Sequence, residues 1–282
     1  MERLAGKTAI VTGGARGIGL ATARCLLREG VILTLWDVDA DALGAARDLL
    51  LREHPGAEVQ IVPCDITDAA AVTRATAFAE TAMGRIDILV NNAGYLAPGN
   101  LLDQPAQQWD RTVSVNLNGL IYTTQAVLPG MYDRNCGHVV NISSAAATLG
   151  VAGLAVYTAT KWAVWGFTES LRQETINLGY GGVRFSSIHP IFLREGMFAG
   201  ARLRGPGALL VPNVRDHEVI GRAVVDWALK RGRRVVMRPR TVRLAVLLRG
   251  ILPNRLFEKL VRILGVSHGM SGWHGDRGGR TD

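Results

Sequence analysis

Tyr157 and Lys161 are four residues apart in a segment whose pattern predicts a helix, so their side chains share one face. An ammonium next to a phenol stabilises the phenolate and lowers the pKa of the tyrosine, which suits it for proton transfer near neutral pH. A surface pair with no chemical role is the other interpretation. Ser144 favours a reactive site, because it ends a predicted strand thirteen residues before Tyr157, where open α/β sheets bind ligands.

A glycine-rich segment, Thr12-Gly13-Gly14-Ala15-Arg16-Gly17-Ile18-Gly19, joins the first predicted strand to the first predicted helix. Glycines in such a turn let a pyrophosphate approach the backbone N–H groups at a helix N-terminus, where the helix dipole favours an anion. A plain structural turn would also contain glycines. Because strand, glycines and helix follow in this order at the start of the chain, the segment predicts a dinucleotide-binding site.

Asp37 ends the second predicted strand, eighteen residues after Gly19. A carboxylate at this place binds the hydroxyl groups of the adenosine ribose and repels a 2′-phosphate. Arg16 would suit such a phosphate, but no arginine stands beside Asp37 in the sequence, so NAD is favoured over NADP. The alternative role of Asp37 is to cap the helix that follows Asp39.

The elements that must position these residues alternate between strand and helix patterns. Most predicted strands are short, nearly continuous apolar runs, as expected when helices cover both faces of a parallel sheet. They span Thr8–Thr12, Val31–Trp36, Val59–Pro63, Ile86–Val90, Gly137–Ile142, Val183–His189 and Arg234–Met237. Among the predicted helices are Leu20–Arg28, Trp109–Leu128, Tyr157–Leu178 and Asp216–Arg231. The alternation predicts an α/β fold: one doubly wound Rossmann-fold domain with a parallel seven-stranded sheet and helices on both faces.

Composition and charge exclude several classes of protein. The 282 residues are 48% hydrophobic, and the three cysteines are scattered without a metal or disulfide spacing, as in cytoplasmic proteins. No secretion signal is visible, and no apolar run reaches the roughly 18 residues that span a bilayer. The net charge of +8 is concentrated in residues 222–282, which hold 14 basic and 4 acidic side chains. The chain has no zinc spacing and no RNA-binding aromatic signature, so we do not expect a nucleic-acid partner despite this positive charge.

From roughly Gly6 to His189 the motifs resemble those of the short-chain dehydrogenases/reductases. The matching residues, in the family's order, are Thr12, Gly13, Gly17, Gly19, Asp65, Asn91, Asn92, Ala93, Gly94, Asn116, Ser144, Tyr157 and Lys161. The resemblance implies that Tyr157 exchanges a proton with the substrate oxygen, Ser144 hydrogen-bonds that oxygen and Lys161 holds the nicotinamide ribose. It also implies that Asn116 binds a water molecule that links Lys161 to solvent.

The resemblance further implies an NAD cleft, with Asp65 and Ile66 beside the adenine. The expected cofactor-binding residues are Gly13, Arg16, Gly17, Ile18, Gly19, Asp37, Asp65, Ile66, Asn92, Ala93, Gly94, Tyr157, Lys161 and Pro190. No metal site is expected. In the alternative interpretation, Asn91 and Asn116 only satisfy buried backbone groups.

Two positions depart from the family pattern. Where the family usually has Pro-Gly after the sixth strand, this chain has Pro190 followed by Ile191, which restricts a backbone that glycine leaves free. Where a threonine often meets the nicotinamide carboxamide, the equivalent position is Glu195. The path of the loop and the carboxamide contact are therefore open, whereas the catalytic set is unchanged.

We expect residues 1–237 to form the Rossmann-fold domain, with a substrate lid over 190–214. The apolar lid residues Phe192, Met197, Phe198, Leu209, Leu210 and Val211 favour a large apolar substrate, and ordinary loop packing is the alternative. Residues 238–265 are expected to be a basic amphipathic extension, in which Pro253 separates two helices over 241–264. These helices either pack on the cleft or a neighbouring subunit, which is favoured, or make peripheral contact with an anionic membrane surface. Residues 266–282 are expected to be a loose tail.

The sequence thus predicts a cytoplasmic NAD(H)-dependent oxidoreductase that interconverts a bulky apolar secondary alcohol, such as a steroid, retinoid or lipid-like alcohol, and its ketone. The competing hypothesis is a non-catalytic dinucleotide-binding module. The set Ser144, Tyr157, Lys161 and Asn116 favours the enzyme, because a pure binder needs no phenol and ammonium at the nicotinamide. The resemblance also implies a homodimer or homotetramer, paired through the helices over 109–128 and 157–178.

Overall fold

The protein's structure, a computed structural model, describes residues 1–193, 195–201, 214–266, 270 and 273. Seven parallel strands form one sheet in the order β3-β2-β1-β4-β5-β6-β7. The strands are β1 (Thr8–Thr12), β2 (Ile32–Asp37), β3 (Val59–Pro63), β4 (Ile88–Asn91), β5 (Gly137–Ile142), β6 (Val183–Pro190) and β7 (Val235–Arg238). The order reverses between β1 and β4, which is where doubly wound sheets bind ligands. The predicted Rossmann fold is confirmed.

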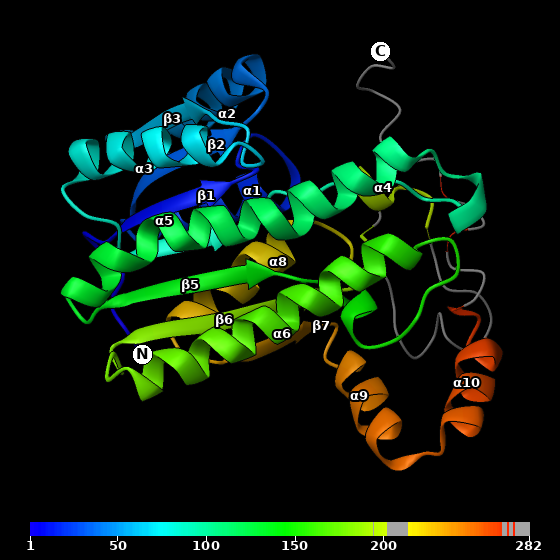
Figure 1. The fold of residues 1–282 in the computed structure, drawn as a ribbon. Helices are drawn as coiled ribbons and strands as arrows, with labels where there is room; N and C mark the ends of the chain where they lie inside the picture. Colours follow the sequence, from blue (N-terminus) through cyan, green and yellow to red (C-terminus); the bar gives the residue numbers. More distant parts are fainter. Residues whose placement is uncertain (194, 202–213, 267–269, 271–272, 274–282) are drawn as a thin grey trace.

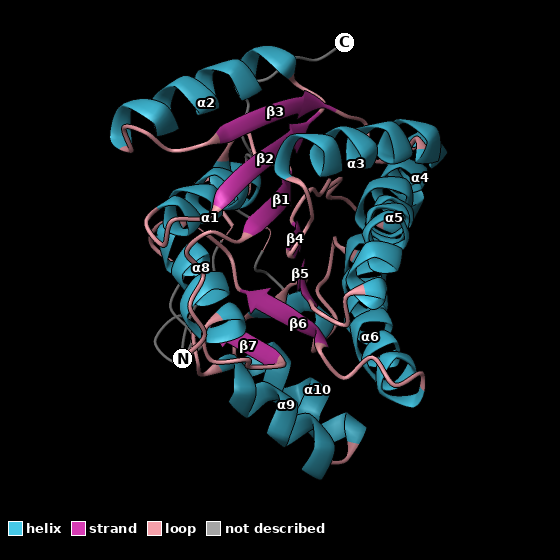
Figure 2. Ribbon diagram, turned by 90° about the vertical axis from the view of Figure 1, so that its left-hand side faces the viewer, coloured by secondary structure: helices cyan, strands magenta, loops and turns pink. Residues whose placement is uncertain are grey.

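Helices cover both faces of the sheet, with α1, α2 and α8 on one side and α3, α5 and α6 on the other (Figures 1 and 2). The helices are α1 (Gly17–Leu27), α2 (Ala40–Glu53), α3 (Ala69–Met83), α4 (Ala106–Val113), α5 (Gly119–Asp133), α6 (Ala155–Asn177), α8 (Glu218–Arg222), α9 (Val242–Ile251) and α10 (Asn254–Ile263). None of these described helices combines the length and apolar content needed to span a bilayer.

The apolar runs of the strands are explained by burial on both faces. In β2, Leu33 and Leu35 pack into the core beneath α1 and α2, whereas Trp36 packs into the second core beneath α3 and α5. All three side chains are fully buried. Because neither face of the sheet meets water, successive residues are apolar and the strand shows no alternation.

Two predicted helices differ from the structure in extent or type. The helix predicted over Trp109–Leu128 runs from Ala106 to Asp133, and its middle, Ser114–Asn118, is a π-helix between α4 and α5. The helix predicted over Asp216–Arg231 is α8 followed by a π-helical segment, Ala223–Leu229. Hydrophobic periodicity averages over several turns and therefore does not detect a single wider turn.

The C-terminal extension forms a helical hairpin, α9 and α10, that projects from the end of β7 (Figure 1). Pro253 separates the two helices and is the N-cap of α10, as expected from its position in the pattern. Three lid residues named above, Leu209, Leu210 and Val211, lie outside the described residues, as does most of the predicted tail.

A buried histidine makes the stability of this fold depend on pH. His138 in β5 is 3% exposed, and its Nε2 lies 2.8 Å from the hydroxyl of Ser186 in β6. Burial lowers its pKa from 6.5 to about 3, so below pH 6.5 the unfolded chain binds a proton that the folded chain does not. As the pH falls through this window, His138 reduces the free energy of unfolding by about 1.4 kcal/mol per pH unit.

We expect His138→Gln to remove about one proton from the pH dependence of the unfolding free energy, measured by urea denaturation between about pH 6 and pH 4. Any packing cost of the substitution appears as a constant offset above pH 7, where histidine is neutral in both states, and serves as the internal control. Curves for wild type and variant that stay parallel at all pH values would show that His138 is not the buried neutral group described.

Candidate active site

A cleft of about 1090 Å³ follows the edge of the sheet where the parallel strands end. Of the predicted site residues, it is lined by all except Gly19 and Asn116. Asp37 and Asp65 stand at one end, and Ser144, Tyr157 and Lys161 stand at the other. The structure therefore brings together, in one cavity, residues that are more than a hundred positions apart in the sequence.

The glycines between β1 and α1 are required by close backbone packing. A Cβ on Gly13 would lie 2.8 Å from the Cα of Ala93, and its φ of +61° belongs to the left-handed region. A Cβ on Gly19 would lie 1.9 Å from the carbonyl oxygen of Gly13. Gly19 thus does not line the cleft but allows α1 to begin directly beneath the turn.

Asp37 is not the cap of α2. That role belongs to Asp39, whose Oδ1 accepts a hydrogen bond of 2.9 Å from the backbone N–H of Ala42. Asp39 also forms an ion pair with Arg16. Asp37 accepts a bond of 3.3 Å from the N–H of Ala15 and lines the cleft, so its carboxylate is positioned at the turn where a ribose would lie.

Thr12, the last residue of β1, is a buried positioning residue whose role the sequence did not indicate. Its Oγ1 accepts hydrogen bonds from the backbone N–H groups of Asn92 at 3.0 Å and Ala93 at 3.1 Å. Asn92 in turn donates to the carbonyl oxygens of Thr12 and Gly13. These bonds lock the loop after β4 onto the loop after β1.

Tyr157 and Lys161 are both nearly inaccessible, at 4% and 5% exposure. The Nζ of Lys161 lies 5.6 Å from the centre of the Tyr157 ring and donates a hydrogen bond of 3.1 Å to the carbonyl oxygen of Ile142, the last residue of β5. The Oγ of Ser144 accepts a bond from the N–H of Ala146, which holds its hydroxyl at the end of the strand.

Burial dominates the ionisation of this pair. It raises the pKa of the Tyr157 hydroxyl, and the hydrogen bond with Ser144 offsets only part of this effect. Burial also lowers the pKa of Lys161 to about 8. In this state the removal of the phenolate from water outweighs the hydrogen bond with Ser144, so the pKa of Tyr157 lies above its ordinary value.

Asn116 lies in the π-helical segment and not on the cleft surface. Its Oδ1 accepts a bond of 2.7 Å from the N–H of Tyr95, and its Nδ2 donates to the carbonyl oxygen of Tyr95 and to Thr160. A Cβ on Gly94 would lie 3.4 Å from Asn116 Oδ1 and 3.9 Å from Lys161 Nζ, so the three residues meet. These bonds to the backbone of Tyr95 agree with the interpretation that Asn116 satisfies buried backbone groups.

The loop after β6 keeps an ordinary backbone. The N–H of Ile191 donates a bond of 2.9 Å to the carbonyl oxygen of Arg238, which continues the pairing of β6 with β7. Among the described residues, Asn135 is the non-glycine residue with positive φ, so Ile191 is under no such strain. Glu195 lines the cleft beside the short helix Gly196–Phe198.

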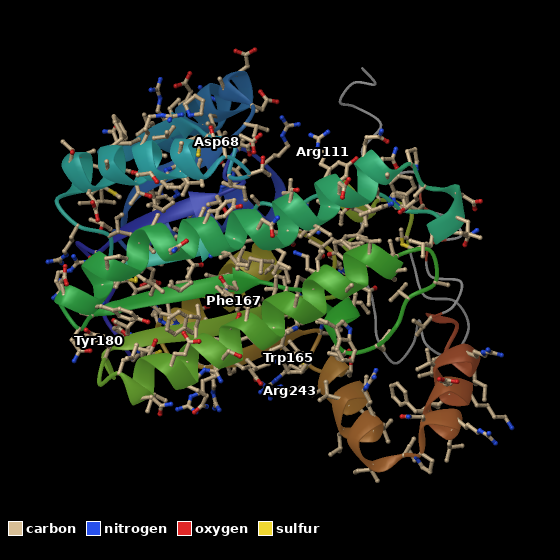
Figure 3. The ribbon with its side chains drawn as sticks, viewed as in Figure 1. Asp68, Arg111, Trp165, Phe167, Tyr180 and Arg243 are labelled. Atoms are coloured by element: carbon tan, nitrogen blue, oxygen red, sulfur yellow. The ribbon has the colours of Figure 1, made fainter. Side chains whose placement is uncertain are left out.

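Arg111 and Tyr95 are cleft residues that the sequence analysis missed. The guanidinium of Arg111 on α4 (labelled in Figure 3) lies 4.7 Å above the ring of Tyr95. Both residues line the cavity. Neither belongs to a recognisable motif. Only the packing of α4 beside the loop after β4 brings them to the site.

A second, apolar pocket adjoins the cleft, and Ser144 and Tyr157 line both. Its other walls come from the lid, through Phe192 and Phe198, and from α9 and α10. The hairpin residues in the wall include Val242, Leu248, Phe257, Leu260 and Val261. The C-terminal extension is therefore packed over the pocket, as the favoured alternative in the sequence analysis predicts.

Comparison with known proteins agrees with this geometry. The chain is 33% identical to epidermal retinol dehydrogenase 2 of Mus musculus over 276 residues, which cover 98% of this chain and 88% of that protein. It is 38% identical to a 3-alpha-(or 20-beta)-hydroxysteroid dehydrogenase of Mycobacterium tuberculosis (strain CDC 1551 / Oshkosh) over 196 residues, 69% of this chain and 72% of that protein. A short chain dehydrogenase/reductase from Burkholderia phymatum, solved in complex with NAD, superposes with a TM-score of 0.78 at 28% identity, covering 89% of this chain and 95% of that chain.

The family model described as short chain dehydrogenase matches residues 7–203. That segment holds the cleft-lining loops, Ser144, Tyr157 and Lys161, together with the strands and helices that position them. Because the model matches well over half of the chain, this protein belongs to the short-chain dehydrogenase family.

Proposed function

We propose that this protein, an oxidoreductase of CH–OH groups by its family, uses NAD(H) to interconvert a bulky apolar secondary alcohol and its ketone. One observation carries the proposal: Ser144 and Tyr157 line both the cofactor-sized cleft and the apolar pocket. The reacting carbon of a substrate bound in the apolar pocket would therefore lie beside the hydroxyls of Ser144 and Tyr157 and beside the cofactor.

The residues present fit a nicotinamide dinucleotide. The buried ammonium of Lys161 donates a hydrogen bond to the carbonyl oxygen of Ile142, and its other N–H groups can donate to ribose hydroxyls. When bound, the nicotinamide supplies or accepts the hydride. Tyr157 gives its proton to the carbonyl oxygen during reduction and takes one from the alcohol during oxidation, while Ser144 hydrogen-bonds the same oxygen.

NAD is the proposed cofactor because of the charge at the adenosine end. Asp37 would accept hydrogen bonds from ribose hydroxyls, and it would face a 2′-phosphate at close range. Arg16, which lies in the glycine-rich turn after β1, already forms an ion pair with Asp39. The Burkholderia phymatum relative was solved with NAD, which supports the same choice.

The substrate is proposed to be apolar and large, such as a steroid, retinoid or lipid-like alcohol. The pocket walls are aliphatic and aromatic, and the two curated relatives are named for retinol and hydroxysteroids. The enclosed space is about 130 Å³, smaller than the roughly 300 Å³ or more of typical ligand pockets. A large substrate would therefore have to extend beyond this pocket into the space that adjoins it.

The hairpin is also proposed to make peripheral contact with an anionic membrane surface. Leu247, Ile251, Leu256 and Ile263 are each at least half exposed, although they are large and apolar. Residues 239–266 contain six basic side chains and one acidic side chain. Exposed apolar groups beside basic ones are typical of helices that lie in a lipid interface. We retain a cytoplasmic location and a homodimer or homotetramer as further proposals.

Tyr157→Phe should lower kcat by about 10²–10⁴-fold, because the phenol is the proton donor and acceptor. The dissociation constant for NAD, measured by calorimetry, should stay within about twofold, since the hydroxyl is not needed to hold the cofactor. Tyr180→Phe, which removes a hydroxyl from a tyrosine that stacks on Tyr132, is the matched control and should keep full activity. Full activity of the Tyr157 variant would rule out the mechanism.

The cofactor preference should respond to Asp37→Ser. Removing the carboxylate takes away a repulsion on the order of 1–4 kcal/mol toward a 2′-phosphate, so the ratio of kcat/KM for NAD to that for NADP should fall or reverse. Asp41→Ser, in the first turn of α2 and outside the cleft lining, is the control for general charge effects. Equal kcat/KM for both cofactors in the wild type would show that Asp37 does not face the ribose.

Membrane contact is tested by flotation with phosphatidylglycerol vesicles at low and high salt. We expect binding by the full chain that persists in part well above physiological salt, because charge attraction alone is screened over about 8 Å. Leu247→Ser/Ile251→Ser should abolish the salt-resistant part. Phe78→Ser/Leu102→Ser changes two exposed apolar residues outside the hairpin and should not. Binding that is lost entirely with salt, or affected alike by both variants, contradicts insertion of the hairpin.

A further inference from the structure

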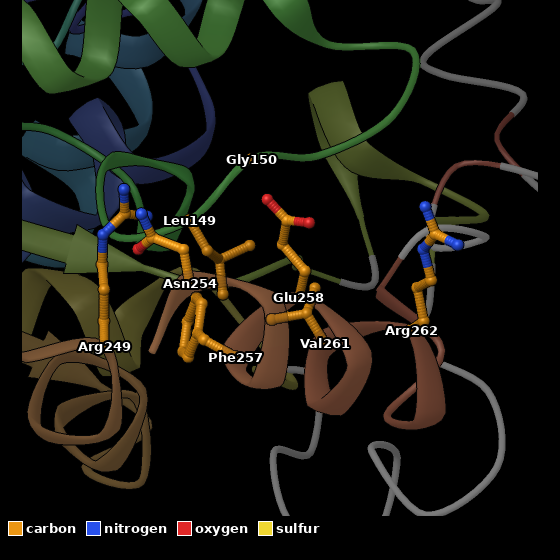
Figure 4. Close-up of a pocket in the computed structure, with 8 residues that line it drawn as sticks. All are labelled: Leu149, Gly150, Arg249, Asn254, Phe257, Glu258, Val261 and Arg262. Atoms are coloured by element: carbon orange, nitrogen blue, oxygen red, sulfur yellow. The ribbon is translucent and has the colours of Figure 1, made fainter. Parts of the chain in front are cut away.

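A polar pocket of about 360 Å³ lies between the hairpin and the loop after β5, outside the cofactor cleft (Figure 4). Arg249 from the end of α9, and Asn254, Glu258 and Arg262 from α10, supply its polar groups. Figure 4 shows Glu258 between the two arginines, with Arg249 and Arg262 at opposite ends. The proposed enzymatic function leaves this pocket without a role.

The polar pocket and the apolar pocket share a wall. Leu149, Phe257 and Val261 line both cavities, so these side chains form the boundary between the polar pocket and the apolar pocket. A ligand whose carbinol reaches Tyr157 would thus pass its far end between these three side chains. The chemistry of the polar pocket then decides which group that end carries.

Arg249 is held in place at this junction. Its guanidinium lies 4.5 Å above the ring of Trp162 on α6 and donates a hydrogen bond of 3.2 Å to the carbonyl oxygen of Thr148. Trp162 is itself fixed by a bond of 2.7 Å to the carbonyl oxygen of Ala146. A guanidinium has five N–H donors, so several remain for a ligand.

The charge of the pocket favours an anion. Two guanidinium groups face one carboxylate, and within the described part of the chain no ion pair involves Arg249, Arg262 or Glu258. An arginine oriented by an aromatic ring and a carbonyl presents a planar fork that matches a carboxylate. Glu258 opposes an anion, and its effect should therefore have the opposite sign to that of the arginines.

We propose that this pocket is a subsite for a carboxylate at the far end of the substrate, so that the preferred substrates are amphipathic hydroxy acids with an apolar body. The proposal rests on the proposed function, since it assumes that the apolar pocket takes the substrate. Arg249, oriented by Trp162 and by the carbonyl oxygen of Thr148, binds the carboxylate. Arg262 lines the opposite end of the pocket, and Leu149, Phe257 and Val261 enclose the apolar body. The subsite selects among apolar alcohols without touching the reacting carbon.

The test compares lithocholate, a hydroxysteroid with a side-chain carboxylate, with its uncharged methyl ester. The full-length enzyme with NAD should show kcat/KM for the acid about tenfold above that for the ester, the size expected of a partly exposed charge-assisted hydrogen bond. Arg249→Gln should lower this ratio by reducing only the value for the acid, and Arg262→Gln, at the opposite end of the pocket, should lower it less. Glu258→Gln should raise the ratio.

Arg255→Gln is the matched control, because Arg255 lies on α10 but lines neither pocket. An equal loss for acid and ester in Arg249→Gln would mean that Arg249 only fastens the hairpin to Trp162, and the proposal would be overturned. If Arg255→Gln shifts the ratio of acid to ester by the same amount, the effect comes from the general positive charge of the hairpin, and the proposal is also overturned.

Binding separates failure of the subsite from failure of the proposed function. Dissociation constants for lithocholate and for its methyl ester are measured by calorimetry on the NAD-loaded Tyr157→Phe enzyme. This measurement does not depend on turnover. If both bind with equal affinity, the apolar pocket takes substrate and the carboxylate subsite is refuted. If neither binds nor is turned over, the proposed substrate class is wrong. Tighter binding of the acid that Arg249→Gln removes supports the subsite.

Discussion

Burial of the Lys161 ammonium is the constraint on which the arrangement of the site depends. A desolvated ammonium needs oxygen atoms aimed at it, and the carboxyl end of β5 provides one through the carbonyl of Ile142. This contact fixes the depth at which α6 sits against the sheet. A hydrogen bond from Asn141 in β5 to Thr168 in α6 ties the same pair of elements together deeper in the core. Tyr157, one turn before Lys161, is thereby placed over the cleft.

The two cavities that meet at Tyr157 are built from different parts of the chain. The cofactor cleft is formed by loops at the ends of the parallel strands, which the sheet holds rigidly. The apolar pocket is closed by the lid and by α9 and α10, which follow the last strand. The two cavities are therefore built by elements that make different contacts with the rest of the fold.

Residues that act at the ends of strands were predictable from the sequence, because a parallel sheet sends all such ends to one edge. Gly13, Asp37 and Ser144 are of this kind. The pKa of Tyr157 was not predictable in the same way, since spacing reports which charges are near but not how little water remains. The orientation of α9 and α10 was also open, because an amphipathic pattern marks an apolar face without saying whether protein or lipid covers it. The position of Arg249 was not predictable either, because it depends on the contact of its guanidinium with the ring of Trp162 in the folded chain.

The π-helical turn at Ser114–Asn118 makes the length of the chain in this region as important as its composition. One residue fewer would restore a regular α-helix and rotate every later side chain by about 100° around the helix axis. Asn116 would leave the backbone of Tyr95, and the outer face of α5 would turn with it. A point substitution along this helix changes one side chain, whereas deletion of one residue would rotate all the side chains that follow it. Natural variation here should therefore occur by replacement and not by loss or gain of residues.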